Sequence, residues 1–155
     1  MKPSQLAKTL PQLLKTGRTP FIWGDPGIGK SDVMRQVATD LKLDLIDLRL
    51  SIYDPTDLKG FPVVKGTGKA QAMHFVPPAT LPTKGKGILF LDELPLAPPS
   101  VQAAAYQLIL DKRLGEYELP KDWVIVAAGN HARNGGVHYS LAPDLANRFI
   151  HIDMA

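Results

Sequence analysis

The stretch GDPGIGKS, residues Gly24 to Ser31, decides the fold. It matches the pattern G-x-x-x-x-G-K-[ST], in which a glycine-rich loop binds phosphate groups. A short apolar segment, TPFIWG, precedes it, and residues 30–41 carry apolar side chains at the spacing of an amphipathic helix. A buried strand, a glycine-rich loop and a helix in this order are the setting that phosphate binding requires.

Each position of the loop has a chemical task. Glycines permit a tight turn with backbone N–H groups directed inward, and the helix N-terminus adds partial positive charge. Lys30 can reach terminal phosphates and the Ser31 hydroxyl can ligate Mg²⁺. The alternative is an ordinary turn rich in glycine and proline. The predicted nucleotide-contacting residues are Gly24, Asp25, Pro26, Gly27, Ile28, Gly29, Lys30, Ser31 and Asp32.

A second stretch, GILFLDELPLAPPS (residues 87–100), predicts a buried strand that stops at two adjacent carboxylates, Asp92 and Glu93. Ligands bind at the carboxyl ends of parallel strands, so Asp92 is expected to hold Mg²⁺ opposite Ser31. Glu93 is then expected to orient and partly deprotonate the attacking water. The alternative is a solvated strand end paired with a lysine.

The rest of the chain predicts an α/β fold with a mostly parallel sheet covered by helices on both faces. Helices are expected over residues 4–15, weakened by Pro11, over residues 30–41, and from Val101 to near Gly115. The segment PVVKGTGKAQAMHFV resembles two short strands around a glycine turn. The expected core strands are TPFIWG, LDLIDLRL, GILFLD, WVIVAAGN and FIHID.

Composition narrows the class of protein. The 155 residues are 45% hydrophobic and 21% charged, with a formal charge of +3 and no cysteine, which fits one globular domain in a reducing cytoplasm. No segment has the length of a membrane span or a signal peptide. The basic residues are scattered, so nucleic-acid binding is not implied. Four histidines, His74, His131, His138 and His151, show no metal-ligand spacing and are interpreted as incidental.

Taken together, the chain resembles an AAA+ ATPase core of the MoxR-like and dynein-related branch. The matching segments are GDPGIGKS, ILFLDE, LAPPSVQAAAYQLI, VIVAAGN and LAPDLANRF. The resemblance implies a three-layer P-loop NTPase sandwich with a five-stranded parallel sheet in the order 5-1-4-3-2. It also implies ATP and Mg²⁺ as cofactors, ATP hydrolysis, and a ring of subunits, typically six, that remodels or assembles a client protein.

The resemblance assigns roles to two further residues. Asn130 resembles a sensor that touches the terminal phosphate and the attacking water, although an Asn after a strand also suits a turn. Arg148 resembles the arginine finger that reaches the ATP of a neighbouring subunit, although it also suits a helix C-terminus. Arg113 and Arg133 are alternatives for lining the subunit interface. The hairpin around KGTGK resembles a pore-facing insert that contacts a client, or else it is a surface turn.

The sequence departs from the family pattern at two points. Pro95 and Leu96 stand where relatives often carry Asn-Arg, which puts coupling between subunits in doubt. The helical lid that normally follows the core is absent before Ala155, so we expect a single core domain over residues 1–155 that is a fragment of a longer protein. These departures keep a second function open, a nucleotide-binding interaction module with little turnover. A nucleic-acid motor or loader is a third alternative because related P-loop ATPases act on DNA, although the weak net charge argues against it.

Overall fold

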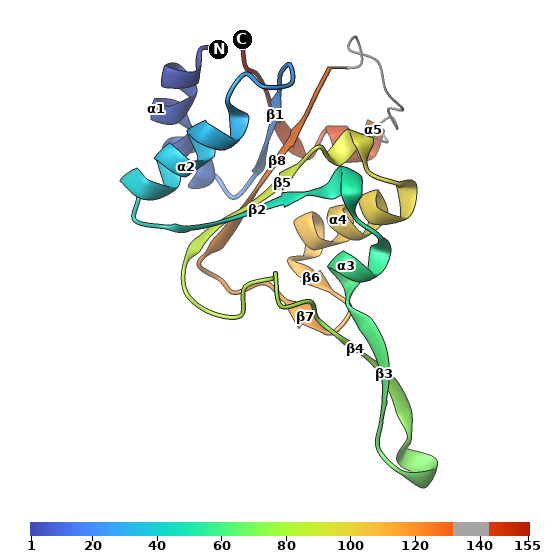
Figure 1. The fold of residues 1–155 in the computed structure, drawn as a ribbon. Helices are drawn as coiled ribbons and strands as arrows, with labels where there is room; N and C mark the ends of the chain where they lie inside the picture. Colours follow the sequence, from blue (N-terminus) through green and yellow to red (C-terminus); the bar gives the residue numbers. More distant parts are fainter. Residues whose placement is uncertain (132–142) are drawn as a thin grey trace.

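The computed structural model describes residues 1–131 and 143–155. Its centre is a five-stranded sheet in the order β2-β5-β8-β1-β9, and every neighbouring pair runs parallel (Figure 1). Numbered along the chain as core strands, this is the predicted order 5-1-4-3-2, which is confirmed. The sheet comprises β1 (Thr19–Trp23), β2 (Asp44–Arg49), β5 (Gly87–Asp92), β8 (Trp123–Gly129) and β9 (Phe149–Asp153).

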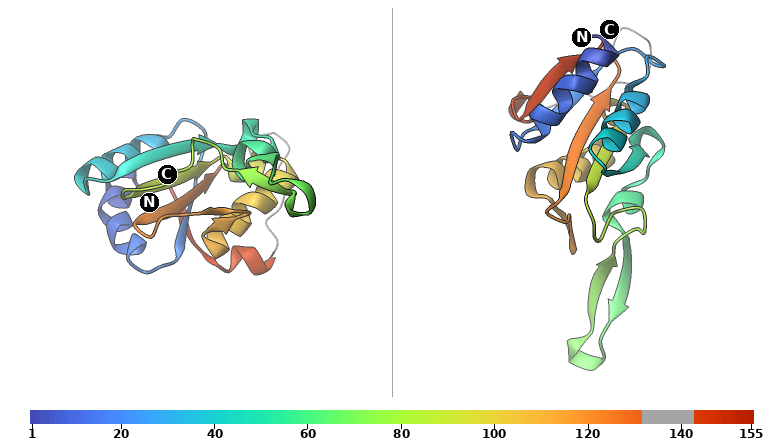
Figure 2. Two further views of the ribbon diagram at one scale, coloured as in Figure 1. Left: turned by 90° about the horizontal axis from the view of Figure 1, so that it is seen from below. Right: turned by 90° about the vertical axis from the view of Figure 1, so that its left-hand side faces the viewer.

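Helices cover both faces of the sheet and complete the three layers (Figures 1 and 2). One face packs against α1 (Pro3–Leu14) and α2 (Lys30–Asp40), and the other packs against α3 (Pro55–Lys59) and α4 (Pro99–Asp111). Short turns complete the described chain: α5 (Pro143–Ala146) and the 3₁₀ turns η1 (Leu50–Ile52), η2 (Gly68–Ala70) and η3 (Leu94–Leu96).

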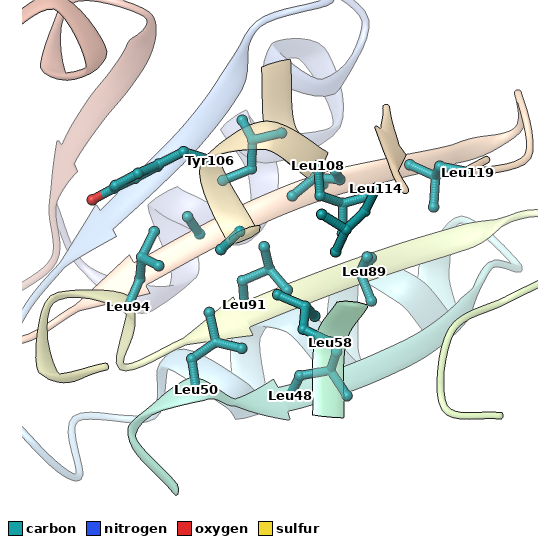
Figure 3. Packing of buried hydrophobic residues seen from close by; sticks show 14 of the residues in the cluster. Leu48, Leu50, Leu58, Leu89, Leu91, Leu94, Tyr106, Leu108, Leu114 and Leu119 are labelled. Atoms are coloured by element: carbon teal, nitrogen blue, oxygen red, sulfur yellow. The ribbon is translucent and has the colours of Figure 1, made fainter. Parts of the chain in front are cut away.

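Strand β5 shows why its sequence is a continuous apolar run. Ile88 and Phe90 enter the core beneath α1 and α2, whereas Leu89 and Leu91 enter the core beneath α4. Figure 3 shows Leu89 and Leu91 among the leucines of the core cluster beneath α4. Because both faces of a central parallel strand are buried, no position is left for a polar side chain until the strand ends. Burial of each such side chain contributes about 1.5–3 kcal/mol.

Helix α1 continues through Pro11, which was expected to weaken it. Pro11 removes one backbone donor from the helical ladder. Packing offsets this loss, because Leu6 and Leu10 are fully buried in the cluster that α1 shares with α2. The predicted helix is therefore confirmed, with its ends one residue earlier than expected.

The end of α4 corrects one prediction. The helix stops at Asp111, not near Gly115, because Lys112 adopts a left-handed conformation with φ of 56° and caps it. A tight hairpin follows, formed by β6 (Arg113–Leu114) and β7 (Tyr117–Glu118). Gly115, with φ of 58°, lies in the turn of that hairpin, so the glycine marks a hairpin turn and not a helix C-terminus.

The predicted hairpin around KGTGK is confirmed as β3 (Phe61–Lys65) and β4 (Ala72–Val76), an antiparallel pair that projects from the core (Figure 2). Glu116 anchors its base. The carboxylate of Glu116 lies 2.6 Å from His74 Nδ1 and accepts the N–H of Phe75 at 2.8 Å. The hydrogen bond with His74 lowers the pKa of Glu116. The two hairpins are thus joined at one carboxylate.

Candidate functional site

A polar cavity of about 330 Å³ lies at the carboxyl ends of the core strands. The loop between β1 and α2 forms one wall, and the residues that follow β5 and β8 form the other. Gly27 and Gly29 turn the loop with φ of 77° and 92°, a conformation that side chains disfavour. Gly29 is also the N-cap of α2, so the helix N-terminus opens on the cavity. The cavity is lined by Pro26, Gly27, Gly29, Lys30, Ser31, Asp32, Arg35, Arg49, Asp92, Glu93 and Asn130.

Lys30 is the buried cation of this cavity, with only 7% of its surface exposed. Its Nζ donates to the carbonyl oxygens of Gly24 and Asp25, both at 3.1 Å, and to Asn130 Oδ1 at 2.9 Å. These contacts use all three ammonium protons. Burial lowers the pKa of Lys30, and the negative charges of the nearby carboxylates counter that effect. The ammonium is therefore fixed at the cavity wall by its own loop.

Asp92 ends β5 and is half-buried beside the cavity. Burial raises the pKa of its carboxyl, while the N–H of Glu93, which donates to Asp92 Oδ1 at 2.8 Å, and the charge of Lys30 act in the opposite direction. A carboxylate that is desolvated without a full complement of partners is stabilised by a cation. Together with the Ser31 hydroxyl in the same cavity, the oxygen donors fit a hard cation such as Mg²⁺.

Glu93 turns the chain out of the sheet. Its backbone is left-handed with φ of 56°, an uncommon conformation for a residue other than glycine, and η3 begins directly after it. Ser51 Oγ donates to Glu93 Oε2, and Arg49 Nε lies 3.9 Å from Glu93 Oε1. The carboxylate of Glu93 is consequently held toward the end of β2.

Ser51 and Arg49 were not predicted from the sequence. The strand register explains their position, because Arg49 of β2 pairs directly with Asp92 of β5. Polar residues at the end of the second strand were the available signal, but only the pairing of β2 with β5 brings them to Glu93.

Asn130 follows β8, which lies between β1 and β5 in the sheet. Asn130 is 8% exposed, and its Oδ1 accepts a hydrogen bond from the Lys30 ammonium. Its position between the glycine-rich loop and the paired carboxylates is the one expected from the family resemblance.

Pro95 makes an apolar contact at a position where the family resemblance led us to expect a polar residue of an Asn-Arg pair. A Cβ on Gly129 would lie 2.6 Å from the Pro95 ring, so the turn after Glu93 packs directly on the backbone before Asn130. The side-chain amide of Gln102 donates to the carbonyls of Pro95 at 3.3 Å and Ala97 at 3.1 Å. This packing and these hydrogen bonds hold the turn that carries Glu93.

Not every predicted contact residue lines the cavity. Gly24, Asp25 and Ile28 shape the loop: a Cβ at Gly24 would lie 2.3 Å from the Ile28 side chain, and the Asp25 carbonyl accepts Lys30. Arg148 lies at the opposite edge of the sheet and lines a different cavity. Arg133 is outside the described residues.

Two of the four histidines have structural partners beside β1. His151 accepts the indole N–H of Trp23 at Nδ1 (2.9 Å), and its Nε2 lies 2.6 Å from the Ala146 carbonyl. His131 stacks on Trp23, with ring centroids 5.9 Å apart, and its Nε2 lies 3.3 Å from Asp153. The contacts of His151 join β1 and β9 to α5. His138 is outside the described residues.

The parallel sheet with a glycine-rich loop opening on a helix N-terminus defines a P-loop nucleotide-binding fold. The model of the AAA domain family, dynein-related subfamily, matches residues 20–149, and the chain belongs to this family. No curated protein sequence matches the chain.

Solved structures show the same fold at low sequence identity. A candidate ATPase of Cytophaga hutchinsonii is 19% identical with a TM-score of 0.69, over 97% of this chain and 46% of that one. NtrX of Brucella abortus in complex with ATP is 19% identical with a TM-score of 0.65, over 97% of this chain and 34% of that one. A point mutant of RuvB from Thermotoga maritima is 18% identical with a TM-score of 0.64, over 98% of this chain and 44% of that one. The chain thus spans less than half the length of each.

Within the described ranges, no helix is long and apolar enough to cross a membrane.

Proposed function

We propose that the chain binds ATP with Mg²⁺ and hydrolyses it. One observation carries the proposal: the buried ammonium of Lys30 and the adjacent carboxylates Asp92 and Glu93 converge on one cavity at a helix N-terminus. Phosphoryl transfer needs two components: positive groups that bind phosphate, and carboxylates that hold a metal ion and a water.

Binding is assigned to the loop and the start of α2. Backbone N–H groups of the loop and the N-terminus of α2 favour phosphate oxygens, and Lys30 adds a full positive charge. Ser31 and Asp92 are the residues that would hold Mg²⁺, which when bound neutralises charge on the phosphates. A relative of the same fold, NtrX, was solved in complexes with ATP and with ADP.

Hydrolysis is assigned to Glu93. Its carboxylate can accept a proton from the attacking water while it orients the water toward the terminal phosphate. In the structure this carboxylate is bonded by Ser51 and lies near Arg49. Movement of Glu93 away from Ser51 is therefore part of the proposed cycle. Asn130, bonded to Lys30, can donate its amide N–H to a phosphate oxygen or to the water.

Arg148 is proposed to act on a neighbouring subunit. It precedes β9, whereas the cavity lies past the carboxyl ends of the strands. A strand of five residues spans about 16 Å, so Arg148 lies at the wrong edge to serve its own nucleotide. Self-association into a ring would bring it to a second site.

Binding of a client protein is assigned to the projecting hairpin β3–β4. Its exposed apolar side chains include Phe61, Val64 and Met73, which are 62–67% exposed. A cavity of about 520 Å³, with Ile52, Phe61 and Val76 in its lining, lies at the base of the hairpin. Residues 58–91 contain five lysines and no acidic residue. Exposed apolar side chains in a segment of the chain that carries lysines and no carboxylate suit a client segment that is apolar and acidic.

A second candidate function is a nucleotide-binding interaction module with little turnover. The specific observation in its favour is that Glu93 is engaged by Ser51, away from a free catalytic position. In that case ATP binding would order the chain for a partner, and hydrolysis would stay negligible at every protein concentration.

The test is a parallel measurement of ATP binding and phosphate release for the wild type and Glu93→Gln, with and without Mg²⁺. We expect both proteins to bind ATP with similar affinity and Glu93→Gln to release phosphate about 10²–10³-fold more slowly. Wild-type binding without release in the presence of Mg²⁺ would favour the interaction module. Full turnover by Glu93→Gln would exclude the assigned role of Glu93.

A further inference from the structure

The carboxylate of Glu116 binds two donors at the base of the hairpin β3–β4. Glu116 lies in the turn between β6 and β7, and these short strands lie beside the base of the projecting hairpin (Figure 1). Its Oε1 lies 2.6 Å from His74 Nδ1, and its Oε2 accepts the N–H of Phe75 at 2.8 Å. Because an ionised carboxylate only accepts hydrogen bonds, His74 Nδ1 is the donor of the first contact. Both oxygens of Glu116 are therefore engaged by β4.

The N–H of Phe75 is a donor on the free edge of β4. Phe75 pairs with Pro62 in the register of the hairpin, and proline has no backbone N–H. The N–H of Phe75 donates to Glu116, so it points away from β3. A backbone donor at a strand edge is open to any acceptor that reaches it. A carboxylate from outside the hairpin supplies that acceptor here.

The surroundings of this donor pair favour a negative charge. Residues 58–91, which include the whole hairpin, contain five lysines and no acidic residue. The hydrogen bond with His74, the N–H of Phe75 and the charge of Lys65 all lower the pKa of Glu116. The hairpin thus offers a site for an ionised carboxylate but contains no carboxylate of its own.

Glu116 is an exchangeable occupant of this site. Its side chain is 49% exposed, and that of His74 is 38% exposed. Water competes for such exposed partners, so their contact contributes little net stability and can be broken at low cost. A second carboxylate that reaches His74 and Phe75 would restore both hydrogen bonds.

The carboxylate site adjoins the apolar cavity at the base of the hairpin. Side chains alternate between the two faces of a strand, so His74 lies on the same face as Val76. Phe61 pairs with Val76, and both residues line the cavity of about 520 Å³. Residues two positions apart in an extended chain are about 7 Å apart. An extended segment can therefore place an apolar side chain in the cavity and a carboxylate at His74.

We propose that His74 and the N–H of Phe75 form a binding site for an acidic side chain of a client segment, and that Glu116 occupies this site until the client displaces it. This inference rests on the proposed client-binding role of the hairpin. The client segment is extended and carries an apolar residue two positions from an aspartate or glutamate. A segment without a carboxylate leaves Glu116 in place and gains only the apolar contacts.

The test uses the nucleotide-free protein and two acetylated pentapeptide amides. One peptide has a central glutamate with a phenylalanine two positions away on either side, so that it can bind in either chain direction. The other peptide has glutamine at the centre. We expect Glu116→Ala to bind the acidic peptide about tenfold more tightly than the wild type does, because the internal carboxylate no longer competes. Its affinity for the neutral peptide should equal that of the wild type.

Glu118→Ala is the matched control, since Glu118 is an exposed glutamate of the same β6–β7 hairpin. It should bind both peptides as the wild type does. His74→Ala, combined with Glu116→Ala, should lower the affinity for the acidic peptide about tenfold and leave the neutral peptide unaffected.

Three outcomes of the titrations contradict the proposal. Equal affinity of Glu116→Ala and the wild type for the acidic peptide would overturn it, as would a gain that the neutral peptide shares. In both cases the hairpin would still bind a client, without a carboxylate site. Binding of neither peptide to any of the proteins would contradict the client-binding role itself, and the inference with it.

Amide exchange of Phe75, followed by NMR, is a second readout that does not depend on affinity. The N–H of Phe75 should exchange about tenfold faster in Glu116→Ala than in the wild type, while the amides of β5 keep their protection and show that the variant is folded. Saturating acidic peptide should restore the protection of Phe75. Unchanged exchange in Glu116→Ala would overturn the proposal, and equal restoration by inorganic phosphate would overturn the assignment to a client carboxylate.

Discussion

Charged side chains lie in opposite environments at the two ends of the core strands, here called the carboxyl edge and the amino edge of the sheet. At the carboxyl edge, Lys30 is buried and fully hydrogen-bonded, and Glu93 is held by the Ser51 hydroxyl in the turn η1 that follows β2. At the amino edge, Arg18 and Arg148 are exposed and form no ion pair with any residue in the described ranges. One edge is thus preorganised by its own chain, whereas the cations of the other have no counter-ion among the described residues.

The largest expected effect comes from Lys30→Ala at the carboxyl edge. The change removes the buried positive charge and leaves the Asn130 amide oxygen without its donor. We expect ATP affinity to fall by at least about 10²-fold and phosphate release to be lost, because charge-assisted hydrogen bonds contribute about 1.5–3 kcal/mol each. Calorimetric titration with ATP checks this, with the exposed Lys8→Ala as control. Wild-type affinity in Lys30→Ala would remove the loop from the binding site.

Asp92→Asn should separate stability from activity. Burial raises the pKa of Asp92 in the folded protein, so ionisation costs folding free energy once the pH exceeds the ordinary carboxyl pKa of about 3.9. Removing that charge should raise the Tm of the nucleotide-free protein by about 2–5 °C at pH 7, with a smaller gain near pH 4.

The same variant should lose the thermal shift that Mg²⁺ and ATP give to the wild type. Thermal unfolding at the two pH values, with and without Mg²⁺ and ATP, tests both statements. A nucleotide-free Asp92→Asn protein that is less stable than the wild type at pH 7 would show that the carboxylate is a structural anchor.

Ser51→Ala sharpens the role of the hydroxyl that holds Glu93. Releasing the carboxylate from Ser51 should change phosphate release about two- to twelvefold while ATP affinity stays constant, since one hydrogen bond is worth about 0.5–1.5 kcal/mol. An increase identifies Ser51 as a restraint on Glu93, and a decrease identifies it as a positioning group. The exposed Ser100→Ala is the control, and identical rates in all three proteins would leave Ser51 without a role.

The smallest expected effect is that of the amino-edge arginines on the stability of their own subunit. Arg18→Ala and Arg148→Ala should change the free energy of unfolding by no more than about 0.5 kcal/mol, because neither side chain has a partner ion in the described residues. Urea unfolding of the nucleotide-free protein measures this. A loss above 2 kcal/mol in either variant would mean that the arginines stabilise their own subunit.

Sequence patterns predicted the carboxyl edge because its determinants are local. GDPGIGKS combines the loop, the lysine and the helix start in eight consecutive residues, and the run before Asp92 reports burial on both faces of β5. The strand order was implied by the family resemblance and is confirmed by the pairing of β8 with β1 and β5.

What the sequence did not reveal depends on register between distant segments. Ser51 reaches Glu93 because β2 pairs with β5, and Arg18 lies beside Arg148 because β1 pairs with β9. The true end of α4 depends on the left-handed Lys112, a conformation that lysine rarely adopts and that no local pattern indicated. In each case the contact is set by tertiary pairing and not by the spacing of residues along the chain.

The proposed ATPase function is tested most directly by the rate of ATP hydrolysis per subunit as a function of protein concentration, with Glu93→Gln as the control. We predict a rate that rises steeply with concentration and then reaches a plateau, because in the proposed ring Arg148 of a neighbour acts at each site. A rate per subunit that is independent of concentration, with the protein monomeric throughout, would contradict it.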